Sequence, residues 1–233
     1  MTLGRTLSEL NEDTEIRAVV ITGAGKAFCA GMDLAELSSG GTERSGFELS
    51  VAGQDEMRDG VEGFSGPVIA AVNGAAATAG FELALACDLI FAAPEAKFLD
   101  THARVGILPG WGLSVRLPRL IGMARAKEVS LSGNALTADR ALDWGLVNRV
   151  VPQARLVEEA LELARDMASC VPHIMEGYKR LIHEGADLPL SEALDRERAI
   201  ATESSKQIGS DEIAARRQGV QLRGRDQGTS SDA

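Results

Sequence analysis

The amino-acid sequence predicts an α/β fold with a helical C-terminal third. Three observations support this prediction: short apolar runs bounded by glycine or proline, helix-like segments between them, and few strand signals after Gly110. The chain has 233 residues, 45% of them hydrophobic, so it can bury a full core without disulfides or metals. No linker separates independent domains; we expect a core over residues 1–152, a helical region over 153–222 and a disordered tail over 223–233.

Four buried strands are expected in the first half of the chain and one in the second. Residues 16–22, IRAVVIT, are rich in β-branched side chains and run into the glycine-rich GAGKAFCAG. Residues 67–74, PVIAAVNG, form a second such run, which a proline opens. The shorter runs CDLIFAA, AKFL and LVNRVV, at residues 87–93, 96–99 and 146–151, complete the set.

Helix signals separate the strands and dominate the end of the chain. A flexible loop, LSSGGTERSG, precedes a helix-like segment that ends near Gly66, and FELALA after Gly80 is typical of a helix start. TADRALDWG has a threonine cap and a terminating glycine, which predicts a short helix. Helical apolar spacing recurs in four later segments: 153–170, 173–184, 190–207 and 211–222.

The composition limits the classes of partner. The net charge is -10 and the isoelectric point is about 4.9, which argues against nucleic acid or an anionic membrane, because phosphates need a basic face. Cys29, Cys87 and Cys170 form no CxxC pair, as expected in a reducing compartment. No apolar run reaches membrane-spanning length, and charges interrupt the region where a signal peptide would be apolar. We therefore expect a cytoplasmic protein.

Two loops of small residues, GAGKAFCAGMD and NGAAATAGFE, follow the two best strands. Small side chains let backbone N–H groups approach a ligand closely, and a helix start directly afterwards adds a positive dipole. Each loop alone is better explained by tight packing between a strand and a helix, because a single glycine-rich loop is a weak signal of a site. Two such loops, each at the end of a strand, favour an oxyanion hole in which two backbone donors converge on one oxygen.

Several motifs in a fixed order resemble one family of enzymes. AFCAGMDL, PVIAAVNGAAATAGFELALACDLIFAA, AKFLDTHARVGILPGWG and LTADRALDWGLVNRVVP resemble the crotonase superfamily, the enoyl-CoA hydratases and isomerases. The resemblance implies a spiral of ββα repeats, C-terminal helices that form a homotrimer or homohexamer, and an acyl-CoA substrate of fatty acid metabolism. It implies no metal and no cofactor, because coenzyme A is part of the substrate. The family also has an N-terminal hairpin, which we expect to be missing here, since only MTLGRTLSELNEDTE precedes the first strand.

The resemblance also assigns residues to the substrate. Met32 and Ala79 correspond to the two backbone donors of the oxyanion hole, with Ala79 in place of a more usual glycine; its N–H is well presented if its φ is negative. The substrate-binding residues implied in this way are Ala30, Met32, Asp33, Leu34, Ala79, Gly110, Trp111 and Lys26. Asp33 is more simply a helix cap, and Trp111 and Lys26 are also explained as a core tryptophan and a solvated lysine.

Glu82 is the only acid in GAAATAGFELALAC, and an isolated carboxylate among apolar residues is costly to bury without a purpose. One interpretation places it on the solvent side of a helix. The resemblance implies the other: related hydratases carry here a glutamate that holds and activates the water added to the double bond. Burial would raise its pKa toward neutrality.

His102 stands four residues before Gly106, where related hydratases carry a second glutamate. Histidine donates or accepts a proton near neutral pH, so it would deliver the proton to the α-carbon. Asp100 would orient the imidazole or itself reach the site, and Arg104 would pair with Asp100. The alternative is that His102 only fixes its loop through hydrogen bonds.

These features predict an acyl-CoA enzyme, and an enoyl-CoA hydratase is the leading hypothesis. The reaction would convert a trans-2-enoyl-CoA into a 3-hydroxyacyl-CoA, with Glu82, His102 and Asp100 as catalytic residues. The same loops also serve isomerases, hydrolases and carbon–carbon lyases, although Trp111 stands where some isomerases carry an aspartate. A catalytically silent paralogue that binds acyl-CoA is the alternative from another class.

Overall fold

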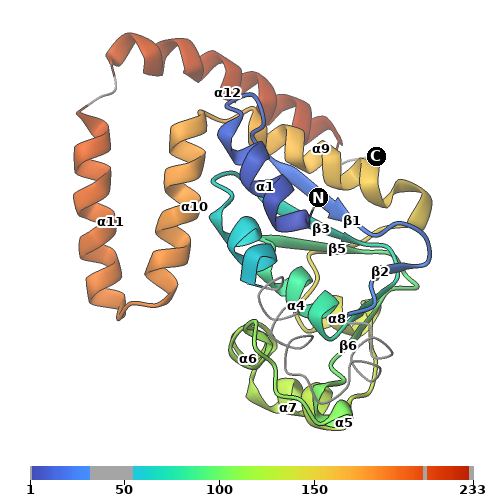
Figure 1. The fold of residues 1–233 in the computed structure, drawn as a ribbon. Coiled ribbons are helices and arrows are strands. Elements are labelled where there is room, and N and C mark those ends of the chain that lie inside the picture. Colours follow the sequence, from blue (N-terminus) through green and yellow to red (C-terminus); the bar gives the residue numbers. More distant parts are fainter. Residues whose placement is uncertain (1, 32–54, 207–208, 231–233) are drawn as a thin grey trace. The chain divides into compact units, whose positions relative to one another are not determined.

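The computed structural model describes residues 2–31, 55–206 and 209–230 (Figure 1). The chain divides into two compact units, Met1–Lys179 and Arg180–Ala233. The first unit holds two sheets and their helices, and the second is helical where it is described. The mixed α/β class and the helical C-terminal region are therefore confirmed, while the predicted loop over residues 37–46 lies outside the described residues.

A parallel sheet passes through the best-buried part of the first unit. Its strands lie in the order β1 (Val19–Thr22), β3 (Val68–Val72), β5 (Leu89–Ala92) and β8 (Arg149–Val150). Every residue of β3 is buried, as its continuous apolar sequence requires for a strand covered on both faces. Ile69 and Ala71 belong to a core with α9 (Leu156–Ala168), whereas the alternate residues of β3 belong to the larger core on the other face.

A second sheet continues the first, because β1, β3 and β5 are each followed directly by a short strand of the second sheet. Its strands lie in the order β2 (Ala27–Cys29), β4 (Ala75–Ala77), β6 (Lys97–Leu99) and β7 (Leu136–Thr137), with only β7 antiparallel. Gly74 makes the turn between β3 and β4, and a Cβ there would lie 2.1 Å from the Lys26 carbonyl oxygen. Since β4 and β6 are parallel, the segments that follow them start at the same edge of the sheet.

Helices surround the sheets in the first unit. Their bounds are α1 (Leu3–Glu12), a helix over residues 55–63, α4 (Ala79–Ala86), α5 (His102–Val105), α6 (Leu113–Ile121), α7 (Met123–Ser132), α8 (Ala138–Asp143), η1 (Gln153–Arg155) and α9. The α1 helix lies backbone to backbone on the helix over 55–63, since a Cβ on Gly4 would come 2.1 Å from the Glu56 carbonyl oxygen. The predicted cap of α8 is confirmed, because the Thr137 side chain accepts a hydrogen bond from the Arg140 N–H.

Several elements of this unit were not predicted from the sequence: α1, α5, α6, α7, β7, and the short strands β2 and β4, which lie in segments expected to be loops. The α6 helix contains Pro118, which removes a backbone donor, and Gly122 separates α6 from α7. These two residues hide a helix pair from any argument based on propensity. The strands β2, β4 and β7 have only two or three residues each, which are too few to show a pattern.

The C-terminal helices follow the predicted spacing closely. They are α10 (Pro172–Ala186), α11 (Leu190–Ser205) and α12 (Ser210–Ser230). In place of the disordered tail expected from residue 223 onward, the structure continues α12 to Ser230. A polar sequence permits an exposed helix as well as disorder, and neighbours such as Glu212 and Arg216 pair along it at 3.3 Å. In none of the described ranges is a helix both long and apolar enough to cross a membrane.

Candidate active site

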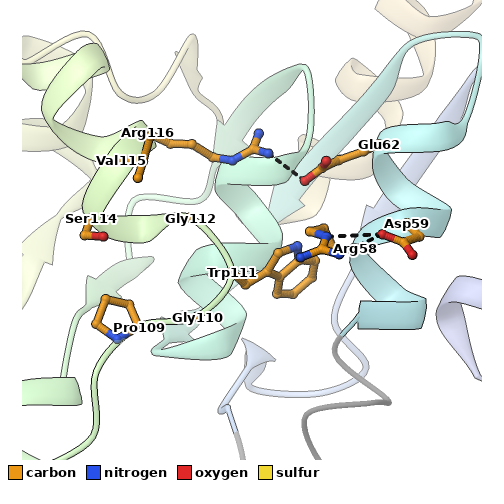
Figure 2. A pocket seen from close by; sticks show the side chains of 10 residues that line it. All are labelled: Arg58, Asp59, Glu62, Pro109, Gly110, Trp111, Gly112, Ser114, Val115 and Arg116. Atoms are coloured by element: carbon orange, nitrogen blue, oxygen red, sulfur yellow. Dashed lines mark hydrogen bonds and ion pairs between the residues drawn. The ribbon is translucent and has the colours of Figure 1, made fainter.

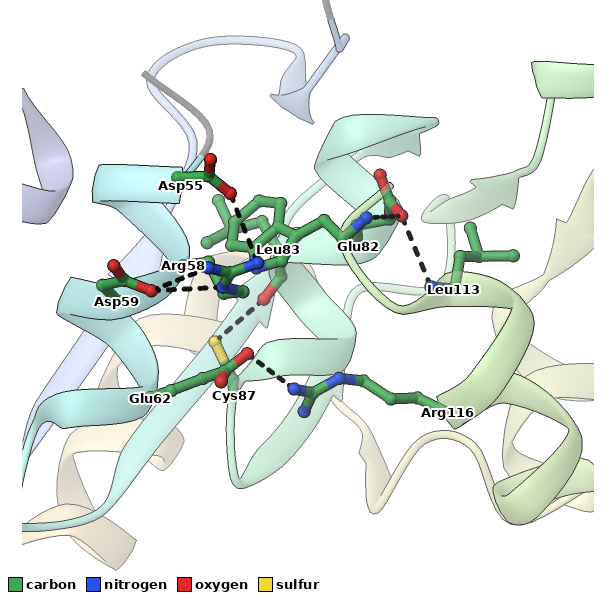
Figure 3. A network of polar contacts seen from close by, with 10 residues as sticks. Asp55, Arg58, Asp59, Glu62, Glu82, Leu83, Cys87, Leu113 and Arg116 are labelled. Carbon is green, nitrogen blue, oxygen red and sulfur yellow. Dashed lines mark hydrogen bonds and ion pairs between the residues drawn. The ribbon is translucent and has the colours of Figure 1, made fainter. Parts of the chain in front are cut away.

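Glu82 is buried in α4, a helix whose eight residues are all buried. With only 2% of its surface exposed, it does not lie on a solvent-facing side of the helix, and that interpretation is wrong. The backbone N–H groups of Trp111 and Leu113 donate to Glu82 Oε1, at 2.9 and 3.3 Å. Figure 3 shows Glu82 with its bond to Leu113. The carboxylate is thus held by the turn that leads into α6, and its second oxygen, Oε2, faces His102.

Burial raises the pKa of the Glu82 carboxyl above its ordinary value of 4.5. The N–H donors of Trp111 and Leu113 and the charge of His102 oppose this effect, and the charge of Asp100 adds to it. The pKa of Glu82 is therefore shifted upward, as predicted from the sequence. A carboxyl with a raised pKa is suited to accept and return a proton near neutral pH.

His102 and Asp100 form a buried pair at the start of α5. Asp100 Oδ1 lies 2.7 Å from the imidazole Nδ1 and accepts the His102 backbone N–H at 3.2 Å. The other ring nitrogen, Nε2, lies 3.8 Å from Glu82 Oε2. The structure thus brings together the three side chains that the sequence marked as candidate acids and bases.

Hydrogen bonds keep Asp100 ionised in spite of its burial. Burial alone would raise the pKa of Asp100, but hydrogen bonds from His102 and Ser130 outweigh it, so the pKa lies below its ordinary value of 3.8. An ionised Asp100 favours a proton on Nδ1 of His102, which leaves Nε2 to face Glu82. The predicted pairing of Arg104 with Asp100 is wrong, because Arg104 donates instead to the Ser132 carbonyl at 2.8 and 2.5 Å.

The two small-residue loops meet at the start of α4. A Cβ on Gly31, whose φ is 86°, would lie 2.8 Å from the Ala77 carbonyl oxygen. The loop that leads to Met32 therefore lies against the loop that leads to Ala79. Such an approach is possible only without a side chain, which explains the glycine.

Ala79 is the first residue of α4, so its N–H has no acceptor within the helix. Its φ is negative, because Thr78, at 53°, is the one non-glycine with a positive φ among the described residues. The condition under which an alanine presents its N–H at this position is therefore met. The strained conformation falls on the preceding residue.

A cavity of about 600 Å³ lies beside the turn that holds Glu82 (Figure 2). Its lining residues are Arg58, Asp59, Glu62, Pro109, Gly110, Trp111, Gly112, Ser114, Val115 and Arg116. The charged residues among them are paired, Arg58 with Asp59 at 3.0 Å and Arg116 with Glu62 at 2.6 Å. Trp111 lines the cavity and also belongs to the main core, as expected of a core tryptophan.

The remaining predicted contacts divide into two groups. Lys26, Ala30 and Gly110 are exposed, and Gly110 also lines the cavity. Met32, Asp33 and Leu34 lie outside the described residues. Within the described ranges, no three side chains of His, Cys, Asp or Glu gather as metal ligands would.

Sequence reasoning missed the groups that hold Glu82 and close the cavity. The donors at Trp111 and Leu113 are backbone groups, which no side chain identifies. Gly112 between them, with φ of 100°, was the available signal, because the sequence PGWG is typical of a tight turn. Arg58 and Arg116 gave no signal, since arginines spaced along a helix are usually solvated.

Comparison with known proteins identifies the family of this chain. Residues 2–218 match the family model described as enoyl-CoA hydratase/isomerase. The chain is 40% identical, over 203 residues, to a protein of Arabidopsis thaliana named probable enoyl-CoA hydratase 1, peroxisomal, covering 85% of this chain and 74% of that protein. It is 38% identical, over 192 residues, to the carnitinyl-CoA dehydratase of Salmonella typhi, covering 82% and 72%.

Solved structures agree as well. The crystal structure of an enoyl-CoA hydratase from Bacillus anthracis superposes with a TM-score of 0.84 at 38% identity, covering 96% of this chain and 84% of that one. An enoyl-CoA hydratase from Polaromonas sp. JS666 gives a TM-score of 0.85 at 36% identity, covering 93% and 84%. The resemblance to the crotonase superfamily is thus confirmed, and the chain belongs to the enoyl-CoA hydratase/isomerase family.

Proposed function

We propose that this protein adds water to a trans-2-enoyl-CoA to give a 3-hydroxyacyl-CoA. The observation that carries the proposal is the buried pair of Glu82 Oε2 and His102 Nε2, 3.8 Å apart, with Asp100 behind the imidazole. Adding water to a double bond removes one proton from water and delivers another to carbon. Two acid–base groups that face the same space supply both transfers.

Glu82 takes the proton of the attacking water in this mechanism. The N–H groups of Trp111 and Leu113 fix Oε1, so Oε2 is the oxygen that accepts the proton. The water oxygen bonds to C3 of the enoyl group, and the electrons of the C2–C3 double bond move onto the thioester carbonyl. An enolate oxygen results, and its charge must be stabilised.

The proposed oxyanion hole consists of the Ala79 and Met32 N–H groups, each worth roughly 3–4 kcal/mol to the transition state. Protonated His102 then delivers its Nε2 proton to C2, while Asp100 orients the ring through Nδ1 and stabilises its charge. Glu82 now carries the proton taken from water. Returning it to His102 across the gap between Oε2 and Nε2 restores the starting state.

The substrate proposed here is an acyl-CoA thioester, with coenzyme A as part of the substrate and no separate cofactor or metal. Trp111 and Gly110 would border the acyl group at the cavity, and the exposed Lys26 would attract the CoA phosphates. We also propose assembly into a homotrimer or homohexamer, supported by exposed apolar side chains such as Tyr178 and Ile182 on α10.

The charged lining of the cavity favours a second candidate, the same chemistry on an acyl group with a polar end. Arg58, Asp59, Glu62 and Arg116 contribute four charges to a wall on which Trp111 is the one aromatic ring. A long alkyl chain would bury these groups without hydrogen-bonding them, which is unfavourable. A short or polar acyl group would avoid that cost.

Hydration of crotonyl-CoA by the purified protein tests the proposal, with longer and polar-ended enoyl-CoAs in parallel. The wild type should form the 3-hydroxyacyl product, and Glu82→Gln should lower kcat by about 100-fold or more. Glu95→Gln, the same change at an exposed glutamate, should leave the rate unchanged. Equal inactivity of wild type and Glu82→Gln on every substrate would reject hydration.

Mass spectrometry of the products separates the alternatives. Isomerised, hydrolysed or cleaved acyl-CoA would identify one of the other reactions that this family scaffold supports. Calorimetric binding of acyl-CoA without turnover would identify a silent paralogue.

A further inference from the structure

Two threonines that precede helices in the site do not cap them. Elsewhere in the chain, Thr2 and Thr137 accept hydrogen bonds from the N–H groups of their own helices, as threonines in this position usually do. Thr78 precedes α4 and Thr101 precedes α5, yet neither side chain makes such a bond. Their hydroxyl oxygens instead lie 2.6 Å apart and share a hydrogen bond. Both α4 and α5 therefore lack the usual threonine cap. The contact between the two hydroxyls indicates a role other than capping.

This contact joins the two halves of the site. Thr78 directly precedes Ala79, and Thr101 lies between Asp100 and His102. The parallel pairing of β4 with β6 ends at Ala77 and Leu99. The hydroxyl bond continues that pairing beyond both strand ends, together with the Thr78 N–H, which donates to the Leu99 carbonyl at 2.8 Å.

The backbone of Thr78 needs such restraints. Its φ of 53° and ψ of -108° lie outside the regions that a β-branched residue normally adopts. Conformations of this kind persist only when their surroundings hold them, and they gather at functional sites. The bends at Thr78 and Thr101 set the directions in which α4 and α5 begin.

We propose that the hydroxyl pair of Thr78 and Thr101 positions the Ala79 N–H relative to His102. The inference rests on the proposed function, in which Ala79 stabilises the enolate oxygen while His102 protonates the neighbouring carbon. The enolate oxygen and the carbon that is protonated belong to one small planar group. The Ala79 N–H and the His102 imidazole must therefore keep a fixed separation. Neither threonine touches the reacting atoms; both act through the residues that follow them.

Isosteric replacement tests this role. Thr78→Val and Thr101→Val keep the shape and branching of the side chain and remove only the hydroxyl. Each is expected to lower kcat for enoyl-CoA hydration by about tenfold, the usual value of one hydrogen bond, with KM changed less than about twofold. The double variant should be no slower than either single variant, because the same bond is already lost. Thr78→Ser keeps a hydroxyl and should recover most of the rate.

Thr137→Val is the matched control, since the exposed Thr137 caps its own helix, α8, and its hydroxyl is not bonded to Thr78 or Thr101. It should lower the melting temperature and leave kcat unchanged. If the wild type is active and both valine variants keep its kcat, the positioning role is overturned and the proposed function is not affected. Additive losses in the double variant, or kcat losses that follow the melting temperature without rescue by serine, would also overturn it. A wild type inactive on every enoyl-CoA would remove the proposed function and this inference together.

Discussion

Replacing Glu82 by glutamine should separate activity from stability. Glutamine has the same shape, and its carbonyl oxygen can accept both N–H groups that now bind Oε1, from Trp111 and Leu113. What disappears is a carboxylate that burial disfavours, as the raised pKa of Glu82 indicates. We expect the melting temperature of Glu82→Gln at neutral pH to be at least that of the wild type, while kcat falls by about 100-fold or more.

A comparison with Glu82→Ala gives the stability that the two hydrogen bonds to residue 82 contribute. Alanine leaves both N–H groups buried without an acceptor, at about 1–3 kcal/mol each. The loss of about 2–6 kcal/mol should lower the melting temperature by several degrees, since 1 kcal/mol corresponds to about 2–4 °C in a chain of this size. Glutamine avoids this loss because both bonds remain.

The raised pKa of Glu82 also determines how the stability difference between Glu82→Gln and the wild type changes with pH. A carboxyl whose pKa is raised by folding stabilises the protein fully below its unfolded value, near 4.5, and loses that contribution as pH rises through the folded value. Glutamine does not titrate, so the stability advantage of Glu82→Gln should grow between pH 5 and pH 8. Thermal melts of the three proteins across this range measure it. A Glu82→Gln variant that melts as low as Glu82→Ala, or whose advantage shrinks as pH rises, would show that burial does not disfavour the Glu82 carboxylate.

Three further changes test other parts of the account. Asp100→Asn should lower kcat by about 100-fold or more. It should also destabilise the protein at pH 7, because a carboxyl with a lowered pKa stabilises the fold above its unfolded value near 3.8, and melts at pH 7 and pH 3 should show this difference disappearing on acidification. Asp88→Ala removes the partner of Lys179, 2.8 Å away and largely buried, and should cost about 3–5 kcal/mol in a denaturant titration with kcat unchanged. Arg116→Gln breaks a half-exposed pair with Glu62, so the free energy of unfolding should change by less than about 1 kcal/mol. The ratio of kcat/KM for longer acyl chains to kcat/KM for crotonyl-CoA should rise. An unchanged ratio would mean that this wall of the cavity does not contact the acyl group.

Glu82 shows why part of the site was predictable from sequence. A lone acid in an apolar, alanine-rich run must be buried if the run forms a core helix, and buried carboxylates in enzymes usually serve a purpose. The apolar run of β3 was equally informative, because a short continuous stretch opened by a proline and closed by a glycine is typical of a strand covered on both faces. In both cases the signal lay within a few neighbouring residues.

The rest of the site depends on contacts between distant segments. The donors to Glu82 come from backbone groups 29 and 31 residues away, and a hydroxyl bond spans 23 residues from Thr78 to Thr101. Arg104 illustrates the opposite error: its closeness in sequence to Asp100 suggested an ion pair, but the α5 helix carries it to the Ser132 carbonyl. Sequence proximity predicted the wrong partner, because helix geometry decides which way a side chain leaves the chain.

In the proposed mechanism, this site adds water to an enoyl thioester through Glu82. Incubating the protein with crotonyl-CoA in H₂¹⁸O and analysing the products by mass spectrometry tests it most directly. The product should be a 3-hydroxyacyl-CoA that carries one ¹⁸O atom at C3 and forms at least about 100-fold more slowly with Glu82→Gln. An unlabelled product, or labelled product formed at the same rate by both proteins, would contradict it.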